Sequence, residues 1–178
     1  MISPAGSSAT FTAAASGNPS PAVQWQVSAN GGGFINIPNA TSTTLIVTGV
    51  TDSMSGNQYR AVFTNLVGAA TTSAGTLTVG DYTIAATPPS QTIPAGHSAT
   101  YTINVAAVGG LAGNVAVTCS GGPPKSTCTV APGSVMLNGK ASAAVTLAPG
   151  KNVGTFTLTF GGSLAGIKHS ANVTLTIK

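Results

Sequence analysis

Few side chains in this sequence can take part in acid–base, nucleophilic or metal chemistry. The 178 residues include two cysteines, two histidines and two acidic residues, both of them aspartate. General acid–base catalysis needs titratable groups that converge in one pocket, and most glycosidases need two carboxylates. Asp52 is explained by a turn between two expected strands, and Asp81 by a domain junction. We therefore expect no catalytic residues, and the sequence predicts that the chain is not an enzyme.

Cys119 and Cys128 flank a short stretch rich in Gly, Pro and Ser, between two alternating segments. This spacing suits a disulfide that holds a loop between neighbouring strands, and closing so short a loop would stabilise by about 2 to 3 kcal/mol. The alternatives are a free thiol pair and a metal site, but zinc needs more ligands than the distant His97 and His169 supply. We expect a disulfide, no metal and no cofactor. A disulfide indicates an oxidising compartment, so we expect an extracellular or cell-surface protein.

The charge of the chain is low and scattered. Charged residues make up 4% of the sequence, against about 25% in an average domain. The net charge is +4, and the basic residues are Arg60, Lys125, Lys140, Lys151, Lys168 and Lys178. Nucleic-acid binders cluster such residues on one stripe. No apolar run is long enough to span a membrane, and "ISPAGSSATF" after Met1 lacks the pattern of a signal peptide. We expect no nucleic-acid partner and no membrane insertion.

Apolar residues alternate with Thr, Ser and Asn along most of the chain, as in "TTLIVTGV", "ATYTINVAA" and "GTFTLTF". Gly, Pro, Asn and Ser interrupt these segments at short intervals, which predicts an all-β fold of short antiparallel strands. The stretch "AGSSATFTAAA" at residues 5–15 is echoed by "AGHSATYTINV" at residues 95–105, and "DYTIAATPPSQTIP" after Gly80 opens a second series of strands. The sequence predicts two tandem β-sandwiches, over residues 1–79 and 81–178.

The first half contains Trp25, followed by "TTLIVTGVTDSMSGNQYRAVFTNLVG", in which Tyr59 stands two residues before Ala61. It resembles the immunoglobulin (Ig) superfamily, particularly bacterial Ig-like domains. The resemblance places Ala13 and Ala61 at the two positions of the inter-sheet cysteines, and Tyr59 at the tyrosine corner. It implies a core packed around Trp25 without that disulfide, and a Tyr59 hydroxyl bonded to the backbone near the preceding turn. The second half looks like Ig-like repeats of secreted bacterial proteins, without a Trp.

The opening strand of the first domain is short or missing, because only residues 1–4 precede the Ala-Gly stretch, whereas residues 82–93 precede its echo. The candidate assembly edge is formed by Ile2, Ser3, Pro4 and Ala5. A strand from a neighbouring molecule could complete the sheet there, and uncharged strand edges favour such pairing. The sequence predicts a non-enzymatic extracellular structural or adhesive protein, such as a filament or stalk subunit. Its expected partners are further copies or neighbouring Ig-like domains.

The alternative is a carbohydrate-binding or spacer module of a secreted multidomain enzyme, with a cell-surface or glycan ligand. A carbohydrate-binding face needs exposed aromatic side chains. Trp25 is expected in the core, and Tyr82 and Phe34 are the best candidates for exposure. An aromatic pair exposed on one sheet face would favour this alternative, whereas an open sheet edge in the first domain would favour assembly.

Overall fold

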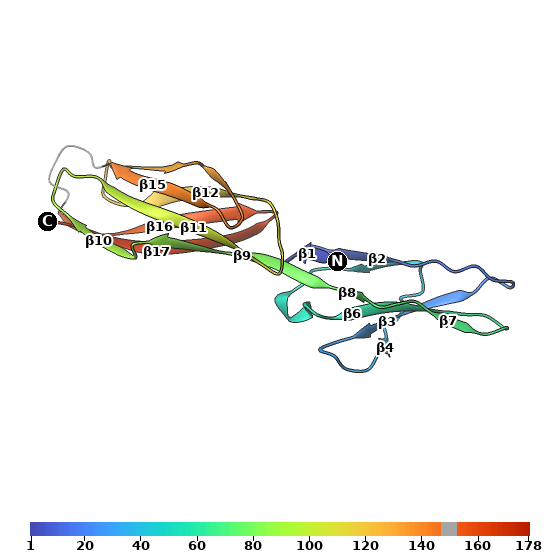
Figure 1. Cartoon of the computed structure of the whole chain (residues 1–178). Helices are drawn as coiled ribbons and strands as arrows, with labels where there is room; N and C mark the ends of the chain where they lie inside the picture. Colours follow the sequence, from blue (N-terminus) through green and yellow to red (C-terminus); the bar gives the residue numbers. More distant parts are fainter. Residues whose placement is uncertain (147–152) are drawn as a thin grey trace. The chain divides into compact units, whose positions relative to one another are not determined.

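Figure 1 shows the computed structural model, which describes residues 1–146 and 153–178. The chain folds into two compact units, Met1–Gly80 (unit 1) and Asp81–Lys178 (unit 2). One strand, β9 (Thr78–Thr87), contributes residues to both units. All regular elements of the described residues are strands, apart from one short 3-10 helix. In the described part of the chain, no helix is long and apolar enough to cross a membrane.

Unit 1 is a sandwich of two small sheets. Its strands are β1 (Ile2–Pro4), β2 (Ala9–Thr12), β3 (Ala22–Ser28), β4 (Ile35–Asn36), β5 (Thr44–Val47), β6 (Gln58–Thr64), β7 (Ala69–Thr71), β8 (Gly75–Thr76) and the start of β9. One sheet pairs β2 with β5, and the other has the order β4-β3-β6-β7, with β8 also against β6. The 3-10 helix η1 (Asp52–Met54) lies between β5 and β6. This division of strands between two sheets is the immunoglobulin-like arrangement.

The core of unit 1 is packed around Trp25, whose side chain is 3% exposed. Its indole Nε1 donates a hydrogen bond to the Ser42 carbonyl at 2.8 Å. The ring centroid of Phe11 lies 6.5 Å from that of Trp25 and 4.7 Å from that of Tyr59. Ala61 is fully buried and stands opposite Trp25 on the β3–β6 ladder. Aromatic packing therefore holds the two sheets together where antibody domains have a disulfide.

The tyrosine-corner hydrogen bond is not seen. Tyr59 is buried at 5% exposure, but within the described residues no hydrogen bond of its hydroxyl is found. Ala13 packs at the edge of the same core. The ring of Tyr59 thus contributes apolar packing against Phe11 and no bond to the preceding turn.

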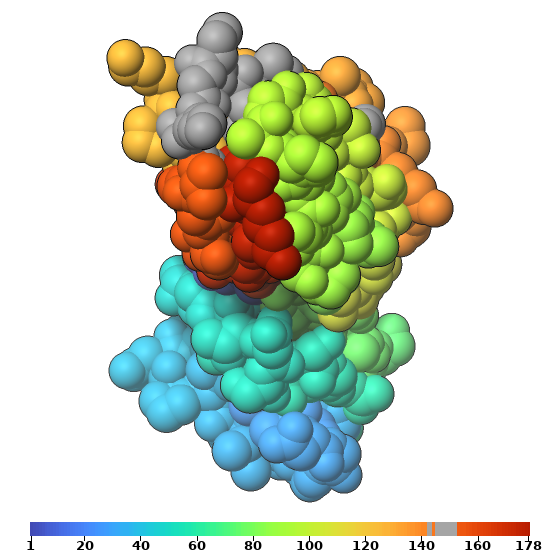
Figure 2. Space-filling view, turned by 90° about the vertical axis from the view of Figure 1, so that its left-hand side faces the viewer, coloured from blue at the N-terminus to red at the C-terminus, as the bar shows by residue number. Residues whose placement is uncertain are grey.

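Unit 2 is a larger sandwich. Its strands are the rest of β9, β10 (Ser90–Ile93), β11 (Ala99–Val108), β12 (Asn114–Gly121), β13 (Thr127–Ala131), β14 (Ser134–Met136), β15 (Lys140–Thr146), β16 (Gly154–Leu164) and β17 (Ile167–Ile177). One sheet has the order β9-β11-β15-β13 and the other β10-β17-β16-β12-β14. In Figure 2 the dark red residues of β17 lie between the orange-red residues of β16 and the yellow-green part of the chain that includes β10, as the order β10-β17-β16 requires.

The β16–β17 hairpin is the longest ladder of unit 2, pairing residues from Gly154↔Ile177 to Leu164↔Ile167. Its two-residue turn has positive φ at both positions, 50° at Ala165 and 88° at Gly166, which matches the twist of the flanking strands. The strands alternate as their sequence predicts, so that one face is buried. Leu158 and Phe160 of β16 are fully buried beside Leu175 of β17.

Two strand pairs depart from the antiparallel arrangement that the sequence predicts. β1 runs parallel to the start of β9, and β10 runs parallel to the end of β17. In unit 2 the physical reason is visible in the strand order, because the chain passes from β9 in one sheet to β10 in the other. In each unit, a short strand near the start of the unit therefore lies beside the last strand of the same unit.

Candidate functional site

The two cysteines form a disulfide, as the sequence predicts. The Cα atoms of Cys119 and Cys128 are 5.8 Å apart, and the described residues contain no free cysteine. Cys119 lies on β12 and Cys128 on β13, which belong to different sheets. The bond therefore joins the two sheets of unit 2, whereas we expected it to hold a loop between neighbouring strands. The spacing of the cysteines cannot distinguish a turn within one sheet from a connection between two.

The turn after Cys119 requires glycine. Gly121 has a φ of 84°, and a Cβ at this position would lie 2.4 Å from the Thr157 carbonyl oxygen. A side chain would therefore meet both an unfavourable backbone conformation and a rigid backbone atom. Gly121 lets β12 lie close to β16 before the chain crosses to the other sheet.

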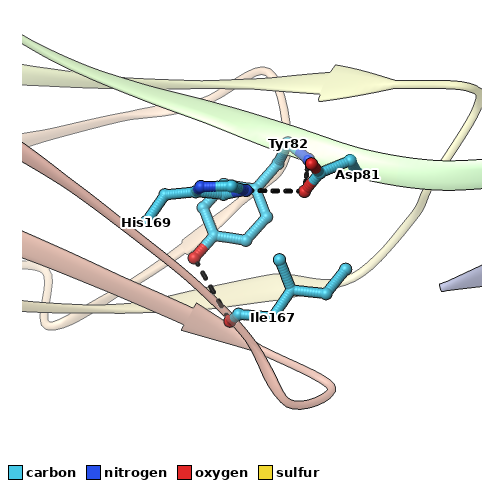
Figure 3. A network of polar contacts seen from close by, with 4 residues as sticks. All are labelled: Asp81, Tyr82, Ile167 and His169. Carbon is cyan, nitrogen blue, oxygen red and sulfur yellow. Dashed lines mark hydrogen bonds and ion pairs between the residues drawn. The ribbon is translucent and has the colours of Figure 1, made fainter. Parts of the chain in front are cut away.

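The two titratable residues that lie closest together are Asp81 on β9 and His169 on β17, shown in Figure 3. The His169 Nε2 atom lies 2.7 Å from the Asp81 Oδ1 atom, and the two side chains are 38% and 21% exposed. The same Oδ1 atom accepts the backbone N–H of Tyr82 at 2.7 Å. Because β9 and β17 lie in different sheets, this pair also connects the two sheets of unit 2. The sequence does not reveal this contact, since its partners are 88 residues apart.

Tyr82 lies under this pair. Its ring meets the imidazole of His169 edge-on, with centroids 4.8 Å apart, and its hydroxyl points toward the Ile167 carbonyl at 3.5 Å (Figure 3). Tyr82 is 1% exposed, and this burial, together with the charge of Asp81, raises the pKa of its hydroxyl. An open cleft of about 250 Å³ lies beside the three side chains, and its lining also includes Ile84 and Ser170.

The hydrogen bonds of the Asp81–His169 pair are made within the pair and to the Tyr82 backbone. An activated nucleophile would have to lie within hydrogen-bond reach of the imidazole, whereas the hydrogen bond that the His169 ring makes among the described residues is to the Asp81 carboxylate. The described residues also contain no cluster of three or more His, Cys, Asp or Glu side chains that could hold a metal ion. His97 lies in the turn before β11, and Asp52 lies at the start of η1. The arrangement suits a structural contact between sheets.

The expected exposed aromatic residues do not form a binding face. Tyr82 is buried, so the expectation that it is exposed is wrong. Phe34 is half-buried, and the Arg60 guanidinium covers its ring at 3.8 Å from the centroid. Arg60 in turn donates from Nε to the Gln26 side chain at 2.8 Å. A sugar would have to displace this guanidinium to stack on that face of the ring.

The candidate assembly edge at Ile2, Ser3, Pro4 and Ala5 is not free along β9. Ile2, Ser3 and Pro4 pair with Thr78, Val79 and Gly80 in register, and Ala5 donates to the Gly80 carbonyl at 3.1 Å. Ser3 is 4% exposed. A short first strand is thus present, and the sequence could not show this because three residues are too few for an alternating pattern.

Comparisons with known proteins give a matching family and a curated relative. Residues 2–81 match a family described as "Domain of unknown function (DUF8696)". A stretch of 74 residues, 42% of this chain, is 54% identical to part of endoglucanase C from Cellulomonas fimi. That stretch covers 7% of the length of endoglucanase C.

Similar solved structures carry Ig domains. The N-terminal four Ig domains of Dscam1 isoform 6.9 share 17% identity with a TM-score of 0.45, over 100% of this chain and 43% of that one. The N-terminal eight Ig domains of DSCAM isoform 1.30.30 share 18% identity with a TM-score of 0.45, over 100% of this chain and 25% of that one. The chain thus spans less than half of either structure. The immunoglobulin-like fold of this chain is defined by its own strand order and pairing.

Proposed function

We propose that this chain is a non-enzymatic, extracellular structural module that acts as a spacer within a longer polypeptide. The observation that carries the proposal is the match to endoglucanase C, in which a stretch 54% identical to this chain makes up only 7% of a long protein. A stretch that makes up so small a share of a long protein is one part joined to others. Its partners in this role are neighbouring domains of the same polypeptide.

The roles of the reactive side chains support a structural module. Cys119 and Cys128 are joined in a disulfide, and Asp81 and His169 are bonded to each other, each pair across the two sheets of unit 2. Neither pair presents a free nucleophile or an unpaired acid to a cleft. Phe34 is covered by Arg60, which disfavours a glycan-binding role. The disulfide also supports an extracellular location, because such bonds persist in oxidising compartments.

Incubation of the purified chain with cellulose and with soluble glucans tests the proposal. We expect no release of reducing sugar and no retention on the insoluble polysaccharide. Hydrolysis by the wild type that is absent in the His169→Ala variant would overturn the non-enzymatic assignment. Retention that is lost in Phe34→Ala would replace the spacer role with carbohydrate binding. Arg60→Ala, which uncovers the Phe34 ring without removing it, is the matched control.

Self-association is a second candidate, in the form of a filament or adhesive stalk, and one surface feature favours it. Leu66 and Val67, in the turn between β6 and β7, are 95% and 81% exposed. Soluble proteins seldom place neighbouring large apolar side chains so far into solvent without a partner. Light scattering and electron microscopy of the concentrated protein test this candidate. Assemblies that disappear in Leu66→Asp would support it, and a monomer at every concentration would exclude it.

A further inference from the structure

The two units repeat one local structure, so their residues can be matched. Pro4, Ala5 and Gly6 correspond to Pro94, Ala95 and Gly96. In unit 1, Ala5 N–H donates to the Gly80 carbonyl at 3.1 Å, and in unit 2, Ala95 N–H donates to the Lys178 carbonyl at 2.8 Å. Both bonds follow a short strand that runs parallel to the last strand of the unit. By this match, Phe11 of β2 corresponds to Tyr101 of β11.

Unit 2 has a strand that unit 1 lacks. Residues 81–87 of β9 pair antiparallel with residues 102–108 of β11, from Thr102↔Thr87 to Val108↔Asp81. The corresponding residues of unit 1 are 12–18, but β2 ends at Thr12 and pairs only with β5. In the described part of the chain, no backbone hydrogen bond involves residues 14–18. Residues 14–18 form no strand, so they continue β2 as an open edge whose backbone groups have no partner strand among the described residues.

Two clefts follow this open edge. One, of about 230 Å³, has Phe11, Thr12 and Ala13 on one wall and residues 72–75 on the other. The second, of about 320 Å³, has residues 15–18 on one wall and residues 67–70 on the other. In unit 2 the strand of residues 81–87 contacts the start of the last strand, through Asp81 and Tyr82. The second cleft lies at the start of β7, next to the β6–β7 turn, which takes the place of the β16–β17 turn of unit 2.

We propose that unit 1 is a strand acceptor, in which an extended segment joined directly ahead of Met1 lies antiparallel along residues 12–18 and fills the two clefts. Unit 2 shows the chemistry of such a segment: its inward residues alternate, with Tyr82 buried and Ile84 and Ala86 half-buried. A neutral, apolar segment fits because the clefts are lined by uncharged residues. This inference does not depend on the spacer role.

The position of the strand in unit 2 indicates that its counterpart comes from the same chain. There it directly precedes β10, separated only by Pro88 and Pro89. A second copy would have to offer a strand edge, because each described strand, from β1 to β17, already pairs with another strand. The backbone groups that are available for pairing in unit 1 lie on a defined side of the segment. Ala13 N–H donates to Thr43 on the β5 side at 2.9 Å, so the peptide groups of Thr12 and Ala14 face the open side.

The test is the full chain with residues 81–90 copied directly ahead of Met1. Because Pro4 matches Pro94, this copy keeps the spacing that unit 2 has between the strand and its short parallel partner. Amide hydrogen exchange, followed by NMR, reports each backbone group. We expect exchange at Ala14 and Ser16 to slow by about tenfold or more, since a paired amide exchanges only when its strand opens.

The matched control carries Ile84→Asp within the copied segment, which places a charge at an inward position and should leave the exchange of Ala14 and Ser16 fast. Trp25 fluorescence shows that unit 1 is folded in both variants. Fast exchange at Ala14 and Ser16 in a folded first variant would overturn the proposal. Protection that appears only in a dimer and disappears on dilution would overturn the assignment of the strand to the same chain.

Discussion

Loss of the Cys119–Cys128 bond should destabilise unit 2 by an amount that its loop length sets. The two cysteines are separated by 9 residues in sequence, and the chain-entropy relation for such a loop gives about 2.6 kcal/mol at 25 °C. In a domain of this size, each kcal/mol moves the melting temperature by about 4 to 8 °C. The double variant Cys119→Ser, Cys128→Ser should therefore melt roughly 10 to 20 °C below the wild type in unit 2.

The chain carries an internal reference for this measurement. Its single tryptophan, Trp25, lies in unit 1, so tryptophan fluorescence reports that unit, while calorimetry and far-UV circular dichroism report both. The transition assigned to unit 2 should fall, and reduction of the wild type should reproduce the effect of the substitutions. A unit 2 transition that stays within about 3 °C of the wild type would refute the loop-entropy reasoning. It would mean that the inter-sheet packing alone sets the stability.

Three further outcomes follow from particular contacts. Tyr101→Phe should stabilise unit 2 by about 1 kcal/mol in urea unfolding, because the buried Tyr101 hydroxyl has no partner among the described residues and its desolvation is not offset; a loss of stability would contradict this. Gly121→Ala should lower the free energy of unfolding of unit 2 by about 2 kcal/mol or more, because the added Cβ meets the Thr157 carbonyl and the backbone has a positive φ. Gly133→Ala, at an open position, should leave this free energy nearly unchanged. Burial raises the pKa values of Tyr82 and Tyr101 above their ordinary value of 10.0. The stability that their neutral forms contribute is therefore complete below about pH 10 and falls as the pH rises toward the folded-state pKa values. Ultraviolet titration at tyrosine wavelengths should show both hydroxyls ionising above the ordinary pKa, and ionisation at the ordinary pKa in the folded protein would contradict this.

The fold class could be read from the sequence because its signal is local. Alternation of apolar and polar residues defines each long strand, and in β16 Leu158 and Phe160 are buried at alternate positions as the pattern requires. The disulfide could be expected for a similar reason, since Cys119 and Cys128 are close in sequence. Which strands the disulfide connects could not be expected from the sequence. Two strands joined by a short turn belong to one sheet in a hairpin and to two sheets in an arch, and the residue types in the turn are much the same.

The Asp81–His169 contact could not be predicted from the sequence. Asp81 and His169 come from the two ends of unit 2, and only closure of the sandwich brings Nε2 within 2.7 Å of the carboxylate. Tyr82 was expected to be exposed because it was one of the few aromatic residues that the expected cores did not include. Its burial depends on the β9–β11 ladder and on β17, neither of which the local sequence describes. Long-range contacts of this kind leave no mark in spacing or periodicity.

The two units hold their sheets together in different ways, and the internal repeat makes the difference interpretable. In unit 2 the sheet β9-β11-β15-β13 is tied to the opposite sheet at both edges, by Asp81–His169 from β9 and by Cys119–Cys128 from β13. Unit 1 has no corresponding strand along residues 12–18, and alanines replace the cysteines of an antibody domain. Its sheets depend on the packing of Trp25 against Phe11. An added strand would cover one edge of that packing, which is the physical reason to expect that unit 1 gains stability when its neighbour in the chain supplies one.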